Sequence, residues 1–187
     1  MDRQVFKEGR GAARSAGAQV PHADDAGAAI GLDRTRVVLD VTRFVLRANA
    51  ETDLLCGICA RLAQPRLYAE ACLTLPAASD AGARRSFYAG ANAQCLTEPD
   101  LFWSLGARAT ALEAALHGST PVRSPTAPDC AVFPLRAAGC VLGVLALTAE
   151  GGRSPGPEEL AELHGLADDI ACTLARVRAD AMQRGLA

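Results

Sequence analysis

The sequence has few aromatic residues and no excess of positive charge, and each shortage excludes a class of protein. Aromatic residues make up 4% of the 187 residues although half are hydrophobic. The core should therefore consist of aliphatic and small side chains, as in helices packed against a sheet. The 19 basic and 21 acidic residues give a net charge of -2. Without a positive field to attract phosphate groups, nucleic acid is not expected as a partner.

Long apolar runs are also missing from the sequence. No stretch approaches the length of a membrane span, and residues 1–30 lack the apolar region of a secretory signal peptide. We therefore expect a cytoplasmic protein with no membrane association. The seven cysteines are an odd number and should be reduced thiols in that compartment, which argues against a disulfide framework.

The length of the chain suits one domain with its own core. Residues 1–30 combine glycine, alanine, serine and mixed charge without periodicity, which predicts a flexible N-terminal tail. Residues 33–50 follow a helical period, and their apolar side chains form one stripe that needs a partner. This stripe consists of Val37, Val38, Val41, Phe44, Val45 and Ala48.

The segments that follow show helical and strand periods in turn. ETDLLCGICARLAQP predicts a second helix that stops at Pro65, and ARATALEAALHG predicts a helix that stops at Gly118. RLYAEACLTLP and ARRSFYAGA predict two antiparallel strands, and TPVRS a short extended piece. Strict alternation in the first strand places Leu67, Ala69, Ala71, Leu73 and Leu75 on one face and Tyr68, Glu70, Cys72 and Thr74 on the other.

Two apolar runs, at 130–135 and 140–147, are separated by RAAG and predict a buried β-hairpin. In its second strand, Gly143 marks a place where another group approaches the backbone closely. Alternation there predicts Val141, Leu145 and Leu147 on one face, and Leu142, Val144 and Ala146 on the other. A long amphipathic helix then begins near Pro157, and its stripe comprises Leu160, Leu163, Leu166, Ala167, Ile170, Ala171, Leu174 and Val177.

This order of elements resembles a GAF domain. The resemblance is carried by ALHGSTPV, FPLRAAGCVLGVLAL and GPEELAELHGLADDIACTLARVR, and DLLCGICARLAQ fits the first core helix. It covers residues 51–178, with 33–50 similar to a signalling helix and 179–187 left as a C-terminal extension. The resemblance implies an α+β, GAF-like (profilin-like) fold, in which a central antiparallel sheet has the N- and C-terminal helices on one face and a ligand pocket on the other.

The same resemblance implies a non-catalytic sensory or regulatory domain in bacterial signalling. Such a domain would bind a small ligand or a signalling partner protein and would form a homodimer through its terminal helices. The candidate pocket residues are Phe87, Trp103, Leu112, His117, Cys130 and Phe133. The family commonly has a longer pocket-covering segment where this chain has only RSPTAPD, so the pocket should be shallow or closed by AGANAQCLTEPDLFWSLG, with Phe102 and Trp103 as plugs. The sequence leaves the cofactor unknown.

Other chemistry has weaker support in the sequence. CGIC places Cys56 and Cys59 three residues apart on a helix, which suits a redox pair, but no second such motif completes a metal site. A thiol-based redox sensor using these residues, or Cys95 with Cys130, is therefore an alternative, as is an adaptor subunit with a filled pocket. Glu70 on an apolar strand would need a partner such as Arg84 or Arg85 if it is interior, and we favour the alternative that it is exposed to solvent near an edge of the sheet. No phosphate loop or nucleophile elbow is present, so an enzyme is not expected.

Overall fold

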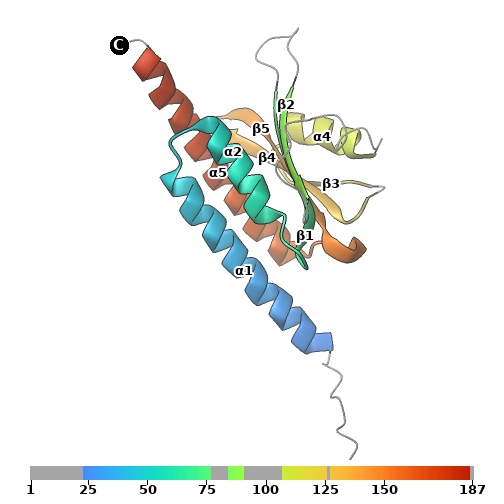
Figure 1. Ribbon diagram of the computed structural model, residues 1–187. Helices are drawn as coiled ribbons and strands as arrows, with labels where there is room; N and C mark the ends of the chain where they lie inside the picture. The colour runs from blue at the N-terminus through green and yellow to red at the C-terminus, as the bar shows by residue number, and fades with distance from the viewer. Residues whose placement is uncertain (1–22, 77–83, 91–106, 126, 186–187) are drawn as a thin grey trace, which may run out of the picture.

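A computed structural model describes residues 23–76, 84–90, 107–125 and 127–185 of the chain (Figure 1). Its helices are α1 (Ala23–Arg47), α2 (Glu51–Leu62), α4 (Ala107–His117) and α5 (Pro157–Gly185), with a short 3-10 turn, η1 (Glu150–Gly152). Its strands are β1 (Tyr68–Leu75), β2 (Arg85–Gly90), β3 (Val122–Arg123), β4 (Cys130–Ala137) and β5 (Cys140–Ala149).

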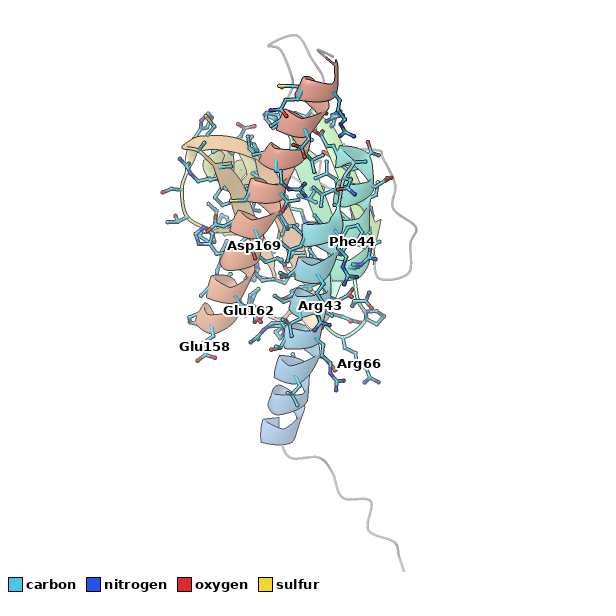
Figure 2. The ribbon with its side chains drawn as sticks, turned by 90° about the vertical axis from the view of Figure 1, so that its left-hand side faces the viewer. Arg43, Phe44, Arg66, Glu158, Glu162 and Asp169 are labelled. Carbon is cyan, nitrogen blue, oxygen red and sulfur yellow. The ribbon has the colours of Figure 1, made fainter. Side chains whose placement is uncertain are left out.

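The five strands form one antiparallel sheet in the order β2-β1-β5-β4-β3. Helices α2 and α5 pack on one face of this sheet, α1 lies over them as an outer layer, and α4 covers the other face (Figure 1). Seen from the outer side, α1 lies between α5 and α2 (Figure 2). The predicted α+β class, with an antiparallel sheet and the terminal helices on one face, is therefore confirmed.

Each face of the sheet has its own apolar core. The helix-side core joins α1, α2 and α5 to the sheet, and its largest fully buried side chains include Tyr68, Phe133, Leu54, Leu73 and Leu145. The α4-side core is smaller and consists of Cys72, Ala111, Leu112, Ala115, Cys130, Val132, Val144 and Ala146. Because both faces are covered, the central strands are buried on both sides, as the hairpin sequence predicted.

The ends of the chain differ from the sequence-based expectation. Helix α1 begins at Ala23, so residues 23–30 are helical although a tail was predicted there. The segment ADDAGAAIG shows no apolar stripe, yet alanine has the highest helix propensity and acidic residues stabilise a first helical turn. At the other end α5 continues to Gly185, so residues 179–185 prolong this helix. Residues 1–22 and 186–187 lie outside the described residues.

Two irregularities interrupt the strict alternation predicted for the strands. The register of β1 shifts between Tyr68 and Glu70, and Tyr68 therefore lies in the helix-side core. The hairpin register also shifts, between Leu135 and Arg136, and Leu142 packs with the helix-side core. The prediction that these two residues face the other way was wrong because a bulge adds one residue to a strand and turns its neighbours over.

Gly143 is required by the closeness of two strands. A Cβ atom at this position would lie 2.6 Å from the backbone carbonyl oxygen of Thr74 on β1. A backbone atom in a central strand has little freedom to move away, so only glycine fits. The predicted close approach is therefore confirmed, and the approaching group is β1.

We expect Gly143→Ala to lower the free energy of unfolding by about 1–3 kcal/mol, because the added methyl group meets backbone inside the sheet. Gly165→Ala is the matched control. Gly165 lies within α5 with no neighbouring atom within 4 Å of an added Cβ, so this change should stabilise the chain by about 0.5–1 kcal/mol. Urea denaturation followed by circular dichroism measures both. Equal effects of the two substitutions would contradict the packing described for Gly143.

Candidate functional site

A group of polar side chains lies on the α4 side of the sheet. The carboxylate of Glu70 on β1 accepts a hydrogen bond from the hydroxyl of Tyr88 on β2, at 3.0 Å. Its other oxygen lies 2.9 Å from the guanidinium of Arg108 on α4, and the side chains of Arg108 and Glu70 are 11% and 28% exposed. We call these three residues the α4-side cluster. They join three elements around one mostly buried ion pair.

The partners predicted for Glu70 were wrong. Arg84 pairs with Glu113 at 2.6 Å, and Arg85 pairs with Glu51 of α2. The antiparallel register explains this, because Gly90 stands opposite Glu70 and Arg85 lies at the far end of β2. Glu70 therefore finds its cation on α4 rather than on the neighbouring strand.

Buried hydroxyl and thiol groups lie on the same face. The hydroxyl oxygens of Thr74 and Ser86 are 2.7 Å apart, and the sulfur of Cys72 lies 3.7 Å from the hydroxyl oxygen of Thr74. Cys130 lies in the α4-side core. The charges of Arg108 and Glu70 act on the thiols of Cys72 and Cys130, so both thiols lie near the ion pair. Thiol and hydroxyl side chains of this kind both donate and accept hydrogen bonds.

The thiols and the phenol of this face are neutral at physiological pH. Burial raises the pKa of Cys72 to about 12, and it also raises the pKa of Cys130. Burial and the adjacent Glu70 carboxylate raise the pKa of Tyr88 to about 12. The face therefore offers neutral hydrogen-bonding groups around one ion pair, and no thiolate.

The six residues predicted to line one pocket do not lie together. Leu112 and Cys130 belong to the α4-side core, whereas Phe87 and Phe133 belong to the helix-side core on the opposite face. Phe87 stands opposite Leu73 and Phe133 opposite Leu145 in the sheet, and both partners face the helices. These four residues therefore cannot share a pocket. The two remaining candidates are His117, whose side chain is 83% exposed, and Trp103, which lies outside the described residues. Phe102, the other proposed plug, also lies outside them.

The CGIC segment in α2 has a packing role. Cys59 is fully buried, and its thiol lies 3.2 Å from the carbonyl oxygen of Phe87, while Cys56 packs at the edge of the helix-side core. A Cβ at Gly57 would meet the ring of Phe44 on α1 at 2.2 Å, so this glycine lets α1 approach α2. The guanidinium of Arg61 lies 3.8 Å from the centre of the same ring. Redox exchange between the two cysteines stays a prediction.

The part of the chain that the structure describes contains no candidate metal site and no candidate membrane span. Within it, no three His, Cys, Asp or Glu side chains lie close enough together to hold a metal ion. None of its helices is long and apolar enough to cross a membrane. Cys95, which the redox alternative pairs with Cys130, lies outside the described residues.

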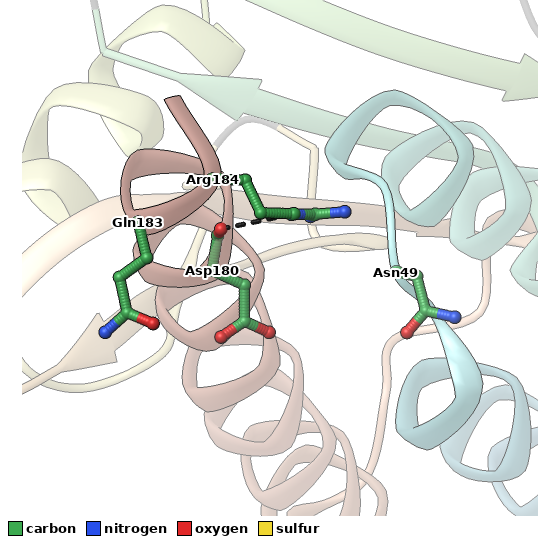
Figure 3. A pocket seen from close by; sticks show the side chains of 4 residues that line it. All are labelled: Asn49, Asp180, Gln183 and Arg184. Carbon is green, nitrogen blue, oxygen red and sulfur yellow. Dashed lines mark hydrogen bonds between the residues drawn. The ribbon is translucent and has the colours of Figure 1, made fainter. Parts of the chain in front are cut away.

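A surface pocket lies where the end of α5 passes the connection between α1 and α2 (Figure 3). Asn49, Asp180, Gln183 and Arg184 line it, and the Arg184 side chain donates a hydrogen bond to the carbonyl oxygen of Asp180 at 3.1 Å. Three of its four side chains are exposed, so they hold few fixed positions for a ligand. The α4-side cluster, with its buried ion pair, is the better candidate site.

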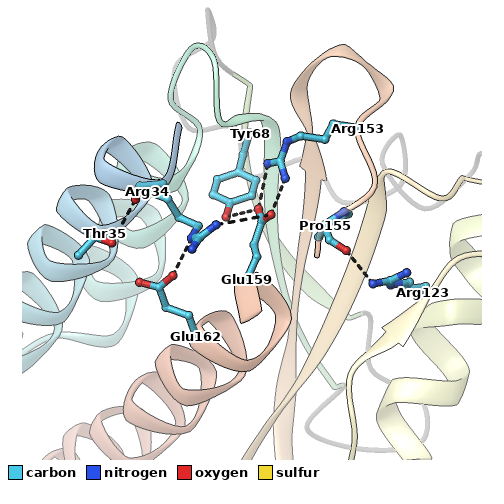
Figure 4. A network of polar contacts seen from close by, with 9 residues as sticks. Arg34, Thr35, Tyr68, Arg123, Arg153, Pro155, Glu159 and Glu162 are labelled. Carbon is cyan, nitrogen blue, oxygen red and sulfur yellow. Dashed lines mark hydrogen bonds and ion pairs between the residues drawn. The ribbon is translucent and has the colours of Figure 1, made fainter. Parts of the chain in front are cut away.

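A second polar network lies on the helix side, around the carboxylate of Glu159 (Figure 4). Glu159 is only 2% exposed at the start of α5. It accepts a hydrogen bond from the Tyr68 hydroxyl at 2.9 Å and is bound by the guanidinium of Arg153. Arg34 of α1 lies 3.9 Å from it and also pairs with Glu162 at 2.6 Å. Burial opposes ionisation of Glu159, but the hydrogen bonds from Arg153 and Tyr68 outweigh burial and lower its pKa.

Sequence reasoning singled out Glu70 but missed its partners. Tyr88 was assigned to a strand without a role, and Arg108 was one of several polar positions on a predicted helix. The pairing joins residues 38 positions apart on different elements, so no local period could reveal it. The available signal was the carboxylate on an apolar strand, which needs a buried partner somewhere.

We expect the cysteines to divide into two reactivity classes. Cys140 and Cys172 are exposed, whereas Cys59, Cys72 and Cys130 are buried, and burial raises the pKa of Cys72 to about 12. Iodoacetamide at pH 8 should therefore label the first two in the folded protein and the other three only in denaturant. Peptide mapping by mass spectrometry identifies each site. Rapid labelling of Cys72 in the folded chain would contradict this placement.

We expect Glu159→Gln to destabilise the chain by about 1.5–3 kcal/mol at pH 7, because charged hydrogen bonds are lost in a buried site. The ordinary pKa of this carboxyl is 4.5 and folding lowers it, so its stabilisation is complete above pH 4.5 and is lost as the pH falls through the folded value. The difference between wild type and variant should therefore shrink in acid. Denaturation at several pH values measures it, with exposed Glu158→Gln as control. A difference independent of pH would oppose this account.

The sequence matches no protein-family model and no curated protein. The structure, by contrast, is similar to the GAF domain from a phosphoenolpyruvate-protein phosphotransferase of Coxiella burnetii, with 15% identity and a TM-score of 0.56, over 81% of this chain and 98% of that domain. The GAF domain of an Acinetobacter phosphoenolpyruvate-protein phosphotransferase matches with 13% identity and a TM-score of 0.51, over 78% and 95%. A five-stranded antiparallel sheet with terminal helices on one face, matched along nearly the whole length of these domains, shows that the chain has the GAF fold.

Proposed function

We propose that this chain is a non-catalytic sensory or regulatory module that binds a small ligand at the α4-side cluster. The observation that carries the proposal is the ion pair between Arg108 and Glu70, mostly buried beside the α4-side core, in which no other charged side chain lies. A buried ion pair adds little to stability compared with apolar side chains of the same volume. Stability alone therefore does not account for this ion pair, whereas binding of a polar ligand would.

The chemistry of the cluster defines the class of ligand. The guanidinium donates hydrogen bonds, the carboxylate accepts them, and the Tyr88 hydroxyl does both. The opposite charges of Arg108 and Glu70 balance, so the cluster favours a neutral or zwitterionic molecule. Such a molecule would present a donor and an acceptor side by side, as an amide or a heterocyclic base does.

The same groups are poorly suited to catalysis. General acid–base catalysis near neutral pH needs a group whose pKa lies close to the working pH. Both Cys72 and Tyr88 have their pKa raised to about 12. They remain protonated and serve as hydrogen-bonding groups, which agrees with a sensor rather than an enzyme.

A route for the signal begins on β1. Glu70 belongs to the proposed ligand site, and Tyr68, two residues earlier on β1, donates its hydrogen bond to Glu159 of α5. Glu159 in turn lies beside Arg34 of α1. A ligand that favours one position of β1 would shift the equilibrium between arrangements of the outer helices. A partner protein or a second copy would then detect the change.

The test is ligand retention and thermal stabilisation of the full chain. Native mass spectrometry, with an absorption spectrum, examines protein purified without denaturation, and a thermal-shift screen examines amides, nucleobases and amino acids. A ligand at 100 times its Kd stabilises the folded state by about 2.7 kcal/mol, which raises Tm by several degrees. We expect Arg108→Gln to abolish the mass or the shift.

Arg84→Gln is the matched control, because it breaks an ion pair with α4 that is about half exposed and lies outside the cluster. Circular dichroism verifies that both variants fold. Equal loss in the two variants would oppose the assigned site. A wild-type chain that retains no molecule and responds to no compound would oppose the sensor proposal.

A further inference from the structure

A threonine hydroxyl is buried without a partner on the α4 side of the sheet. Thr148 on β5 is 6% exposed. Its hydroxyl oxygen is shielded from solvent and has no hydrogen-bond partner among the residues that the structure describes. A polar atom that leaves water without gaining a new partner makes the folded state less stable. Valine has a side chain of nearly the same shape without the hydroxyl, so packing does not explain a threonine at this position.

The register of the sheet places Thr148 beside the α4-side cluster. Thr148 stands directly opposite Glu70 of β1 and directly opposite Cys130 of β4. Residues that stand opposite each other in a sheet share a face, and Cys130 belongs to the α4-side core. The three side chains therefore form one row across three strands, on the face that α4 covers, with Thr148 in the middle.

The neighbours of Thr148 in this row do not use its hydroxyl. The two carboxylate oxygens of Glu70 are bound by Tyr88 and by Arg108. Cys130 is a neutral thiol, because burial raises its pKa, and thiols are weak hydrogen-bonding groups. The charge of Arg108 acts on Cys130 as well as on Glu70, so the guanidinium lies close to the residue between them. The Thr148 hydroxyl can therefore donate and accept a hydrogen bond beside the cluster.

We infer that the Thr148 hydroxyl is a further contact for the ligand of the α4-side cluster and that it selects ligands by a second polar group. The inference rests on the proposed function, in which Arg108, Glu70 and Tyr88 hold a first group that presents a donor and an acceptor side by side. Thr148 adds a position for a hydroxyl or carbonyl group of the same molecule.

The geometry of the sheet defines the chemical class of this ligand. Glu70 and Thr148 lie on neighbouring strands, which are about 4.8 Å apart. The two polar groups of the ligand should be separated by about this distance, which a chain of about two carbon atoms between them provides. The side chains of Arg108 and Thr148 are 11% and 6% exposed, so a molecule that reaches both must be small. A short amide with a hydroxyl or carbonyl group at its other end meets these conditions.

The first experiment compares two compounds that differ in one group. 3-Hydroxypropanamide carries an amide and a hydroxyl at the required spacing, and butanamide has a methyl group in place of the hydroxyl. Titration followed by NMR measures the Kd of each compound for the full chain. We expect the wild type to bind 3-hydroxypropanamide about tenfold more tightly, because only this compound pairs with the buried Thr148 hydroxyl. Thr148→Val should bind the two compounds with equal affinity.

Arg108→Gln separates this inference from the proposed function. It removes a contact to the amide group, so it should weaken the binding of both compounds. Equal binding of the two compounds by the wild type, or a preference that Thr148→Val retains, would overturn the role of Thr148 and leave the ligand site in place. Failure of the wild type to bind either compound would also overturn this inference. The proposed function fails only when the wider screen of compounds finds no ligand as well.

The second experiment tests whether the fold itself uses the hydroxyl. Without ligand, Thr148→Val should raise Tm by about 2–6 °C, because a buried polar atom without a partner is removed. Thr74→Val is the matched control. Thr74 is also buried on this face, but its hydroxyl oxygen lies 2.7 Å from that of Ser86, so this substitution breaks a hydrogen bond and should lower Tm. Thermal denaturation followed by circular dichroism measures both variants.

A rise in Tm together with a loss of ligand preference is the result that a purely structural role of Thr148 would not produce. If Tm of Thr148→Val is unchanged or falls, as expected for Thr74→Val, the hydroxyl is already satisfied in the folded chain, for example by water. That result would overturn the inference, whatever the Kd values are.

Discussion

The arrangement of the helices depends on the carboxylate of Glu159. This charge is buried at the start of α5, where hydrogen bonds with Arg153 and Tyr68 and the charge of Arg34 stabilise it. Arg34 extends the same network to α1, which packs on α2 and α5 as an outer layer. One anion therefore holds the terminal helices, the turn before α5 and the first strand in a fixed relation. Apolar packing alone is less specific about how helices sit on a sheet.

Much of this fold could be predicted from the sequence because it depends on local periods. The apolar stripe of α5 and the alternation in the hairpin could be predicted because the buried face of each element carries apolar residues at a regular period. Gly143 in the middle of a strand indicated that another group approaches the backbone there, and this group is β1. The bulges at Tyr68 and Leu142 could not be predicted, because the sequence of a strand does not show which residue lacks a partner on the neighbouring strand. The start of α1 was missed because alanine-rich helix carries no apolar stripe.

The candidate site was harder to predict because its parts come from three elements. Glu70 was visible as an acidic residue among apolar ones, but Arg108 becomes its partner only when α4 lies over the sheet. The aromatic residues chosen for a pocket were wrong for a related reason. Phe87 and Phe133 stand opposite Leu73 and Leu145, so the register of the strands turns both side chains toward the helix-side core, and this register is not visible in the sequence.

The bulge in β1 connects the two sides of the molecule. In a regular strand, residues two apart point to the same face, so Tyr68 and Glu70 would lie on one side. The register shift between them sends Tyr68 to Glu159 and the helices, and Glu70 to Arg108 and α4. A displacement of this short segment therefore acts on both polar groups at once. The proposed ligand site and the network that holds the outer helices therefore share a strand segment of three residues.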